Sequence, residues 1–132
     1  MGSKSNEFET LILNHIFGGS AWNQPTHLYV ALSKSTLSDT CFGTNLRGEV
    51  TGGAYARKQC DTWSVSNGTS SNNIAITFNQ ATASWGTLVS FAICDHSSTG
   101  DVLYYGTLTT SKSIGTSDQA KFATGDIDVT EG

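Results

Sequence analysis

The sequence is poor in charged residues. Only 14% of its 132 residues are Asp, Glu, Lys or Arg, whereas an ordinary soluble domain contains about 25%. The seven basic residues are scattered, and only Arg57 and Lys58 are adjacent. Proteins that bind nucleic acid neutralise several phosphates with a basic stripe. The scattered basic residues and the net charge of −4 therefore argue against nucleic acid as a partner.

The sequence also lacks a disulfide pattern and a long apolar run. Its cysteines, Cys41, Cys60 and Cys94, are far apart and odd in number, whereas a secreted disulfide framework needs an even set at close spacing. The N-terminus has no signal-type apolar core, and no stretch approaches the roughly 20 apolar residues of a membrane span. We therefore expect three reduced, largely buried thiols in a protein that is made in a cytoplasm and has no membrane partner.

Motifs that would support catalysis or metal binding are missing as well. The triplet Cys94-Asp95-His96 would need two further zinc ligands, and no CxxC or HxxxH spacing supplies them. The same triplet shows no base-activated thiolate or oxyanion site. Asp126 and Asp128 lack the Asp-rich loop of a calcium site, so we interpret them as solvated charges on an edge strand. The sequence thus predicts no catalytic residue, no metal and no cofactor.

What the sequence has in abundance is Ser and Thr, about a quarter of the chain, between short apolar runs. Ile74, Ile76 and Phe78 alternate with other residues, which is typical of a half-buried strand. The run 88–93 is apolar on both parities, which indicates a central strand covered on both faces. Turn residues recur every 8–12 residues. This pattern predicts an antiparallel β-sandwich, jelly-roll-like, of about seven to eight strands in a single domain over residues 1–132.

Further strands are expected over 27–32, 54–65, 102–108, 121–122 and 125–129. We expect a long polar loop over 33–53 and a second polar loop over 109–117. Asn67-Gly68 marks a turn, although the polar stretch that follows it is longer than a two-residue hairpin loop.

A short N-terminal helix is expected over about residues 6–17. Asn6 is the predicted cap, with Glu9 three residues later in a capping-box pattern, and Gly18-Gly19 ends the helix. A helix of about three turns is not stable alone. Its apolar stripe must therefore pack on its own domain or against a symmetry-related copy, and we take the residues of this stripe as candidate subunit contacts: Phe8, Leu11, Ile12 and Ile16.

The aromatic residues have two interpretations. Aromatic side chains in a small β fold usually form the core or a subunit interface, where they bury large areas. They could instead form a platform on which sugars stack. The residues concerned are Trp22, Trp63, Trp85, Tyr29, Tyr55, Tyr104 and Tyr105.

Several blocks, in this order, carry a resemblance to a known family. They are Leu28–Ser33 (LYVALS), Glu49–Arg57 (EVTGGAYAR), Ala81–Thr87 (ATASWGT), Leu103–Thr109 (LYYGTLT) and Gly125–Val129 (GDIDV). Together they resemble a family of small virion proteins of tailed bacteriophages, often labelled as tail fibre or structural proteins. The resemblance spans nearly the whole chain.

This resemblance implies a structural component of the virion, assembled in the host bacterial cytoplasm, and not an enzyme. Within that class the first expectation is a capsid decoration or cement protein that binds the major capsid protein as a homo-oligomer, with a trimer favoured. A charge-poor surface suits a protein that packs against neighbours. The alternative is a tail fibre, adaptor or baseplate component that contacts tail proteins and could also bind host glycan.

Overall fold

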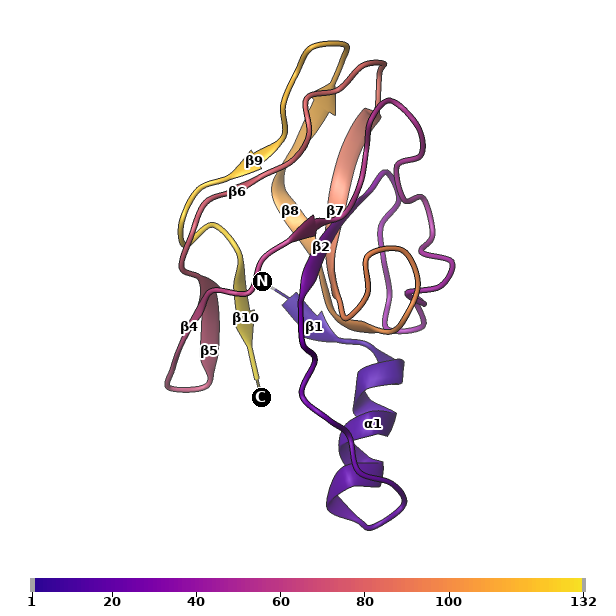
Figure 1. Ribbon diagram of the computed structural model, residues 1–132, viewed down its shortest axis with the longest axis vertical. Coiled ribbons are helices and arrows are strands. Elements are labelled where there is room, and N and C mark those ends of the chain that lie inside the picture. Colours follow the sequence, from indigo (N-terminus) through magenta and orange to yellow (C-terminus); the bar gives the residue numbers. More distant parts are fainter. Residues whose placement is uncertain (1, 132) are drawn as a thin grey trace.

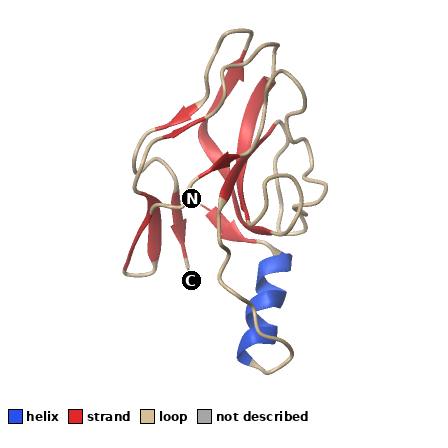
Figure 2. Cartoon of the chain, in the orientation of Figure 1, coloured by secondary structure: helices blue, strands red, loops and turns tan. Residues whose placement is uncertain are grey.

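The computed structural model describes residues 2–131, in which strands predominate and one short helix stands near the N-terminus (Figures 1 and 2). The expected mainly-β, largely antiparallel fold is therefore confirmed. In chain order the elements are β1 (Gly2–Lys4), α1 (Asn6–Ile16), β2 (Tyr29–Ser33), β3 (Lys58–Gln59), β4 (Trp63–Ser66), β5 (Thr69–Asn72), β6 (Ile76–Thr77), β7 (Gly86–Cys94), β8 (Val102–Ile114), β9 (Lys121–Phe122) and β10 (Asp128–Thr130).

The strands form one large sheet and one small ribbon. The large sheet has the order β3-β2-β7-β8-β1-β10-β5-β4, and β6 pairs with β9 in the ribbon. Each neighbouring pair is antiparallel except β1 and β10, which are parallel. In the sheet order, β1 is therefore the strand through which β10, β5 and β4 join the remainder of the sheet.

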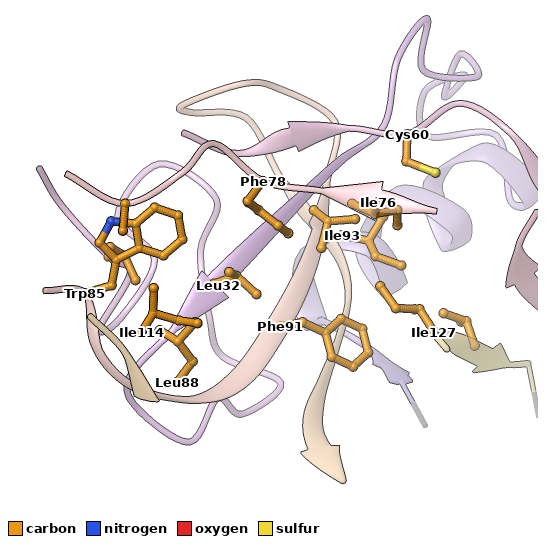
Figure 3. Packing of buried hydrophobic residues seen from close by; sticks show 14 residues of the cluster. Leu32, Cys60, Ile76, Phe78, Trp85, Leu88, Phe91, Ile93, Ile114 and Ile127 are labelled. Carbon is orange, nitrogen blue, oxygen red and sulfur yellow. The ribbon is translucent and has the colours of Figure 1, made fainter. Parts of the chain in front are cut away.

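The main core lies between the central strands of the large sheet and the β6–β9 ribbon (Figure 3). Phe91 of β7 packs against Phe122 of β9, with ring centroids 6.5 Å apart, and Phe122 also contacts Phe78 at 6.3 Å. Leu32 of β2 and Leu88 of β7 are each 1% exposed. Complete burial of such a side chain contributes about 1.5–3 kcal/mol, so this layer is a principal source of stability.

A second apolar cluster covers the other face of β2 and β7. Ala31, Ala92 and Cys94 of these strands pack there with Leu37 and Leu46 of the long loop between β2 and β3. The prediction that β7 is covered on both faces is thus confirmed. The loop between β2 and β3 therefore packs over this second face and shields it from solvent.

The polar segment after Asn67-Gly68 is a strand, and the expectation that it is too long for a two-residue hairpin loop was wrong. Asn67 and Gly68 both have positive φ values, 51° and 76°, as a tight hairpin turn requires, and β4 pairs directly with β5. β5 has no apolar alternation that would reveal it as a strand. Its position in the large sheet comes from pairing with β4 and β10.

Two other strand predictions were wrong in extent. β8 continues to Ile114, through the expected loop over 109–117, because its last residues pair with the first residues of β7. The strand expected over 54–65 is interrupted. Gly52, Gly53 and Ala54 have φ values of 73°, 60° and 68°, and the indole N–H of Trp85 donates to the Gly53 carbonyl at 2.8 Å. This left-handed turn excludes an extended strand at that point.

A buried ion pair holds the loops together around Arg57. The Arg57 guanidinium donates to both carboxylate oxygens of Glu49, at 2.7 Å from Nε and 2.9 Å from Nη2. The same guanidinium donates to the backbone carbonyls of Gly43, His96 and Thr99 at 2.8–3.1 Å. The side chain of Arg57 is 1% exposed. One residue therefore connects the loop between β2 and β3 with the loop between β7 and β8.

Tyr55 completes this network from the same segment. Its hydroxyl donates to Glu49 at 2.8 Å and accepts the Leu32 backbone N–H at 3.0 Å, while its ring lies 5.4 Å from Trp85. The block EVTGGAYAR is thus a structural unit. Its residues Glu49, Gly53, Tyr55 and Arg57 all make bonds that hold the loop between β2 and β3 against the body of the protein.

We predict that Arg57→Ala lowers the free energy of unfolding by about 3–5 kcal/mol, because it leaves the mostly buried Glu49 carboxylate without its charged partner and three backbone carbonyls without their donor. Urea unfolding followed by tryptophan fluorescence measures this loss. Arg47→Ala is the matched control, since Arg47 is exposed, and it should change stability by less than about 0.5 kcal/mol. A loss below about 1 kcal/mol for Arg57→Ala, the range of a surface ion pair, would contradict the assignment.

Candidate functional site: an exposed helix face and two grooves

Helix α1 is rooted in the body of the protein by its first residues. Ser5 is the N-cap, and its hydroxyl accepts the Phe8 N–H at 3.2 Å, so the prediction of Asn6 as the cap with a Glu9 capping box was wrong. Ser5 is the cap because it directly follows β1, where it is fully buried and its N–H donates to the Leu103 carbonyl at 3.1 Å. The predicted helix end is confirmed, because the helix ends at Ile16 and a left-handed Gly18 follows.

The inner face of the helix packs on its own chain. Phe8 is 7% exposed, and its ring lies 5.1 Å from Trp22 and 5.2 Å from Tyr104 of β8. Leu11 and Ile12 are half-buried. Of the four candidate subunit contacts, Phe8 is thus covered within its own chain and Ile16 is exposed.

The outer face of the helix is apolar and uncovered. Leu13, Ile16 and Phe17 are 55%, 64% and 79% exposed, and their spacing of three and four residues places them on one side of the helix. Figure 1 shows the helix projecting from the strands, attached at its first turn. We call Leu13, Ile16 and Phe17 the outer helix face. Clustered exposed apolar side chains of this kind mark contact surfaces. Leu13 and Phe17 were not among the candidate subunit contacts. Their spacing of three residues before and one residue after Ile16 indicates that all three side chains share one face of the helix.

This helix is short. Within residues 2–131, no helix has both the length and the apolar character that a membrane span needs.

The first groove, of about 570 Å³, lies beside the β4–β5 hairpin. Val65 of β4 is 76% exposed there. Two carboxylates in its wall are occupied within the chain: Asp61 accepts the Leu28 N–H at 3.0 Å, and Glu131 accepts the Tyr104 hydroxyl at 2.7 Å. We call this the apolar groove, because most of its wall is formed by apolar side chains, among them Leu28, Trp63, Val65, Leu103, Tyr104 and Val129.

The second groove, of about 620 Å³, lies between β8 and β9. Beside it the β7–β8 pairing shifts from Leu88↔Lys112 to Ser90↔Thr107, so that four residues of β8 oppose one residue of β7. A bulge of this kind re-aims side chains at the edge of a sheet. We call this the polar groove, because short hydrogen-bonding and charged side chains dominate its wall, among them Thr107, Thr109, Lys112, Asp118, Gln119 and Lys121.

The three cysteines are buried, as expected, and no disulfide joins them within residues 2–131. Burial raises the pKa of the Cys94 thiol to about 12, so it carries no thiolate at neutral pH. The His96 ring faces its own turn, where Nδ1 accepts the backbone N–H groups of Ser98 and Thr99 at 3.1 Å. The triplet therefore has no activated nucleophile. In the part of the chain that the structure describes, no three His, Cys, Asp or Glu side chains gather as a metal site.

Asp126 and Asp128 are exposed, as expected, but their interpretation as edge-strand charges was wrong. β10 lies inside the sheet between β1 and β5, and Asp126 precedes it. Asp128 accepts a hydrogen bond from the Ser71 hydroxyl of β5, and Asp126 accepts the Ala123 N–H at 2.8 Å. Each carboxylate thus serves a local structural bond.

The aromatic residues are distributed over the core, the helix root and the apolar groove. Trp85 is 2% exposed, and Tyr55 packs against it. Trp22 covers Phe8 at the helix root, whereas Trp63 and Tyr104 line the apolar groove. These positions place most of the large rings in packing contacts.

An acidic pair lies at the helix root. The Glu7 carboxylate accepts the Gly43 N–H at 3.1 Å and lies beside the carboxyl group of Asp101. Burial, followed by the interaction with Asp101, raises the pKa of Glu7 to about 7.

Comparison with known protein families gives one match. A family model described as "Podophage GP4 fiber I protein gp80" matches residues 3–130. A comparison with curated proteins found no match.

We predict that the protein loses stability as the pH rises from about 5 to about 8. The unfolded chain releases the Glu7 proton near its ordinary pKa of 4.5, whereas the folded chain holds it to about 7. The unfolded state therefore binds fewer protons across this window, and its relative free energy falls as pH rises. Glu7→Gln mimics the protonated form and should flatten the dependence. Urea unfolding at several pH values measures the effect, and an equal slope in the variant would contradict it.

Proposed function

The chain belongs to the Podophage GP4 fiber I protein gp80 family, and from this premise we propose that it is a structural component of a phage virion, located in the tail fibre apparatus. The observation that carries the proposal is the extent of the match, residues 3–130. The resemblance to phage virion structural proteins found from the sequence is thereby confirmed. The fibre protein family supports the tail fibre alternative better than capsid decoration, the first expectation from the sequence.

The geometry supports a structural role and not an enzymatic one. The buried polar network around Arg57 joins loops to one another, and the candidate nucleophile Cys94 is a buried, protonated thiol. An enzyme site would instead bring a nucleophile or base into a pocket with an oriented partner. The rigid body and its exposed outer helix face suit a component that is held by contacts with tail proteins.

The first prediction of this proposal concerns copy number. Quantitative mass spectrometry of purified particles should find the protein in a few copies for each particle, far below the major capsid protein. It should remain with the tails when the heads are disrupted. Hundreds of copies that leave together under mild denaturant, with weakened shells, would instead indicate capsid decoration. Absence from purified particles would contradict the proposal entirely.

A second candidate function is glycan binding, which the polar groove favours. Saccharide hydroxyls need short donors and acceptors at close range, and Thr107 supplies a hydroxyl. Asp118 Oδ2 and Gln119 Nε2 already bond to the Gly115 N–H and the Phe78 carbonyl, so the oxygens that these side chains still offer are Oδ1 and Oε1. Lys112 and Lys121 line the same groove, and neither is in an ion pair in the described part of the chain. The half-buried ring of Phe122 provides an apolar surface beneath them. A fibre component with such a groove could contact the surface polysaccharide of the host.

We predict that purified surface polysaccharide of the host binds the protein in a calorimetric titration. Replacing Lys112 and Lys121 together with Ala should weaken binding about tenfold or more, equivalent to about 1.4 kcal/mol. Lys34→Ala is the matched control, because Lys34 is exposed and outside the groove. A flat titration with the unmodified protein would remove this candidate function.

A further inference from the structure

Each copy of this chain has a convex apolar surface with no cover. The helix has apolar side chains on two faces, of which the inner face is covered by Trp22 and Tyr104. Leu13, Ile16 and Phe17 of the outer helix face are each more than half exposed. A helix that is apolar on both sides is ordinarily buried on both sides. The outer face therefore indicates a missing neighbour.

The same chain also has a concave apolar surface. The apolar groove is large enough for several side chains, at about 570 Å³, and Val65 on its hairpin wall is 76% exposed. The two carboxylates in its wall accept hydrogen bonds within the chain, Asp61 from the Leu28 N–H and Glu131 from the Tyr104 hydroxyl. An apolar occupant would therefore bury no unpaired charge, which is the usual cost of closing such a site.

A helix cannot place its outer face in the groove of its own chain. Phe8 on the inner face contacts Tyr104, and Tyr104 itself lines the groove. The inner face is thus the side turned toward the chain's own groove, whereas Leu13, Ile16 and Phe17 occupy a different side of the same helix, which is held at its root by Ser5 and Phe8. In Figure 1 the helix extends away from the strands. The groove can therefore receive an outer helix face from a second copy only.

We propose that the outer helix face of one copy docks into the apolar groove of a second copy. The occupant is a second copy because both complementary surfaces occur on one chain, and a single repeated contact covers both. A foreign partner on the helix would leave the groove open. The contact is heterologous, since helix meets groove and not helix, so it repeats from copy to copy and closes as a ring when the rotation allows.

The test uses two substitutions that introduce the same charge. Phe17→Glu places a carboxylate on the outer helix face, and Val65→Glu places one in the apolar groove. Both side chains are exposed in the monomer, so each variant should fold, which circular dichroism verifies. Ile74→Glu is the matched control, because Ile74 is 51% exposed and lies outside the groove.

Light scattering coupled to gel filtration, over a range of concentrations, measures molar mass. The unmodified protein and Ile74→Glu should exceed the monomer mass of 14.0 kDa as concentration rises. Phe17→Glu alone and Val65→Glu alone should each associate at least tenfold more weakly. A mixture of the two variants should form a two-copy complex, since the intact helix of one and the intact groove of the other restore one contact.

Three results would overturn the proposal. The first is an unmodified protein that stays monomeric at all concentrations, which would assign the outer helix face to a different protein. The second is self-association that survives both substitutions. The third is a mixture that remains monomeric although each variant has lost association, which would mean that the outer helix face and the apolar groove do not contact each other. The measurement uses purified protein alone, so its outcome is independent of the location of the protein in the virion.

Discussion

The Arg57–Glu49 ion pair is the constraint on which the remainder of the structure depends. The loop between β2 and β3 is long and mostly polar, and it has few apolar residues with which to hold itself in place. Arg57 holds the loop in place by donating hydrogen bonds to three backbone carbonyls as well as to Glu49. Gly43 belongs to this loop, whereas His96 and Thr99 belong to the loop between β7 and β8, so the guanidinium joins the two loops through backbone acceptors. Leu37 and Leu46 can then cover the second face of β7.

This arrangement also explains how a chain with so little charge forms stable layers. The main core and the second cluster both use β7, which carries apolar residues on its two faces. β4, β5 and the second half of β8 are rich in Ser and Thr, whose hydroxyls tolerate solvent and whose β-branched or small side chains suit a pleated surface. Few long charged side chains cover these strands, which suits a surface that contacts other proteins.

The sequence predicted those elements whose signal is local. The apolar stripe of the helix and the double-sided run in β7 each follow from residues close together in the chain. The alternation around Ile76 predicted the burial of Ile76 and Phe78, but it was wrong for Ile74, which is 51% exposed and lies outside the two-residue strand β6. β5 was missed because its position depends on pairing with β4 and β10, which no local pattern reveals. The site was predicted in part. Ile16 was named, but which helical face turns inward is decided by Tyr104, almost a hundred residues away.

The outer helix face and the apolar groove are connected through β1. This three-residue strand pairs with β8 on one side and β10 on the other, and it runs directly into the cap of the helix at Ser5. In the sheet order, β10, β5 and β4 meet the remainder of the sheet at β1, and Val65 on β4 belongs to the groove.

Displacing β1 would loosen the helix root and the hairpin wall of the groove together, because both depend on its ladder bonds. A short helix that is unstable alone thus owes its orientation to the same strand that positions the hairpin. The two surfaces are therefore presented in a fixed relation, and a contact that repeats between copies requires that relation to be the same in every copy.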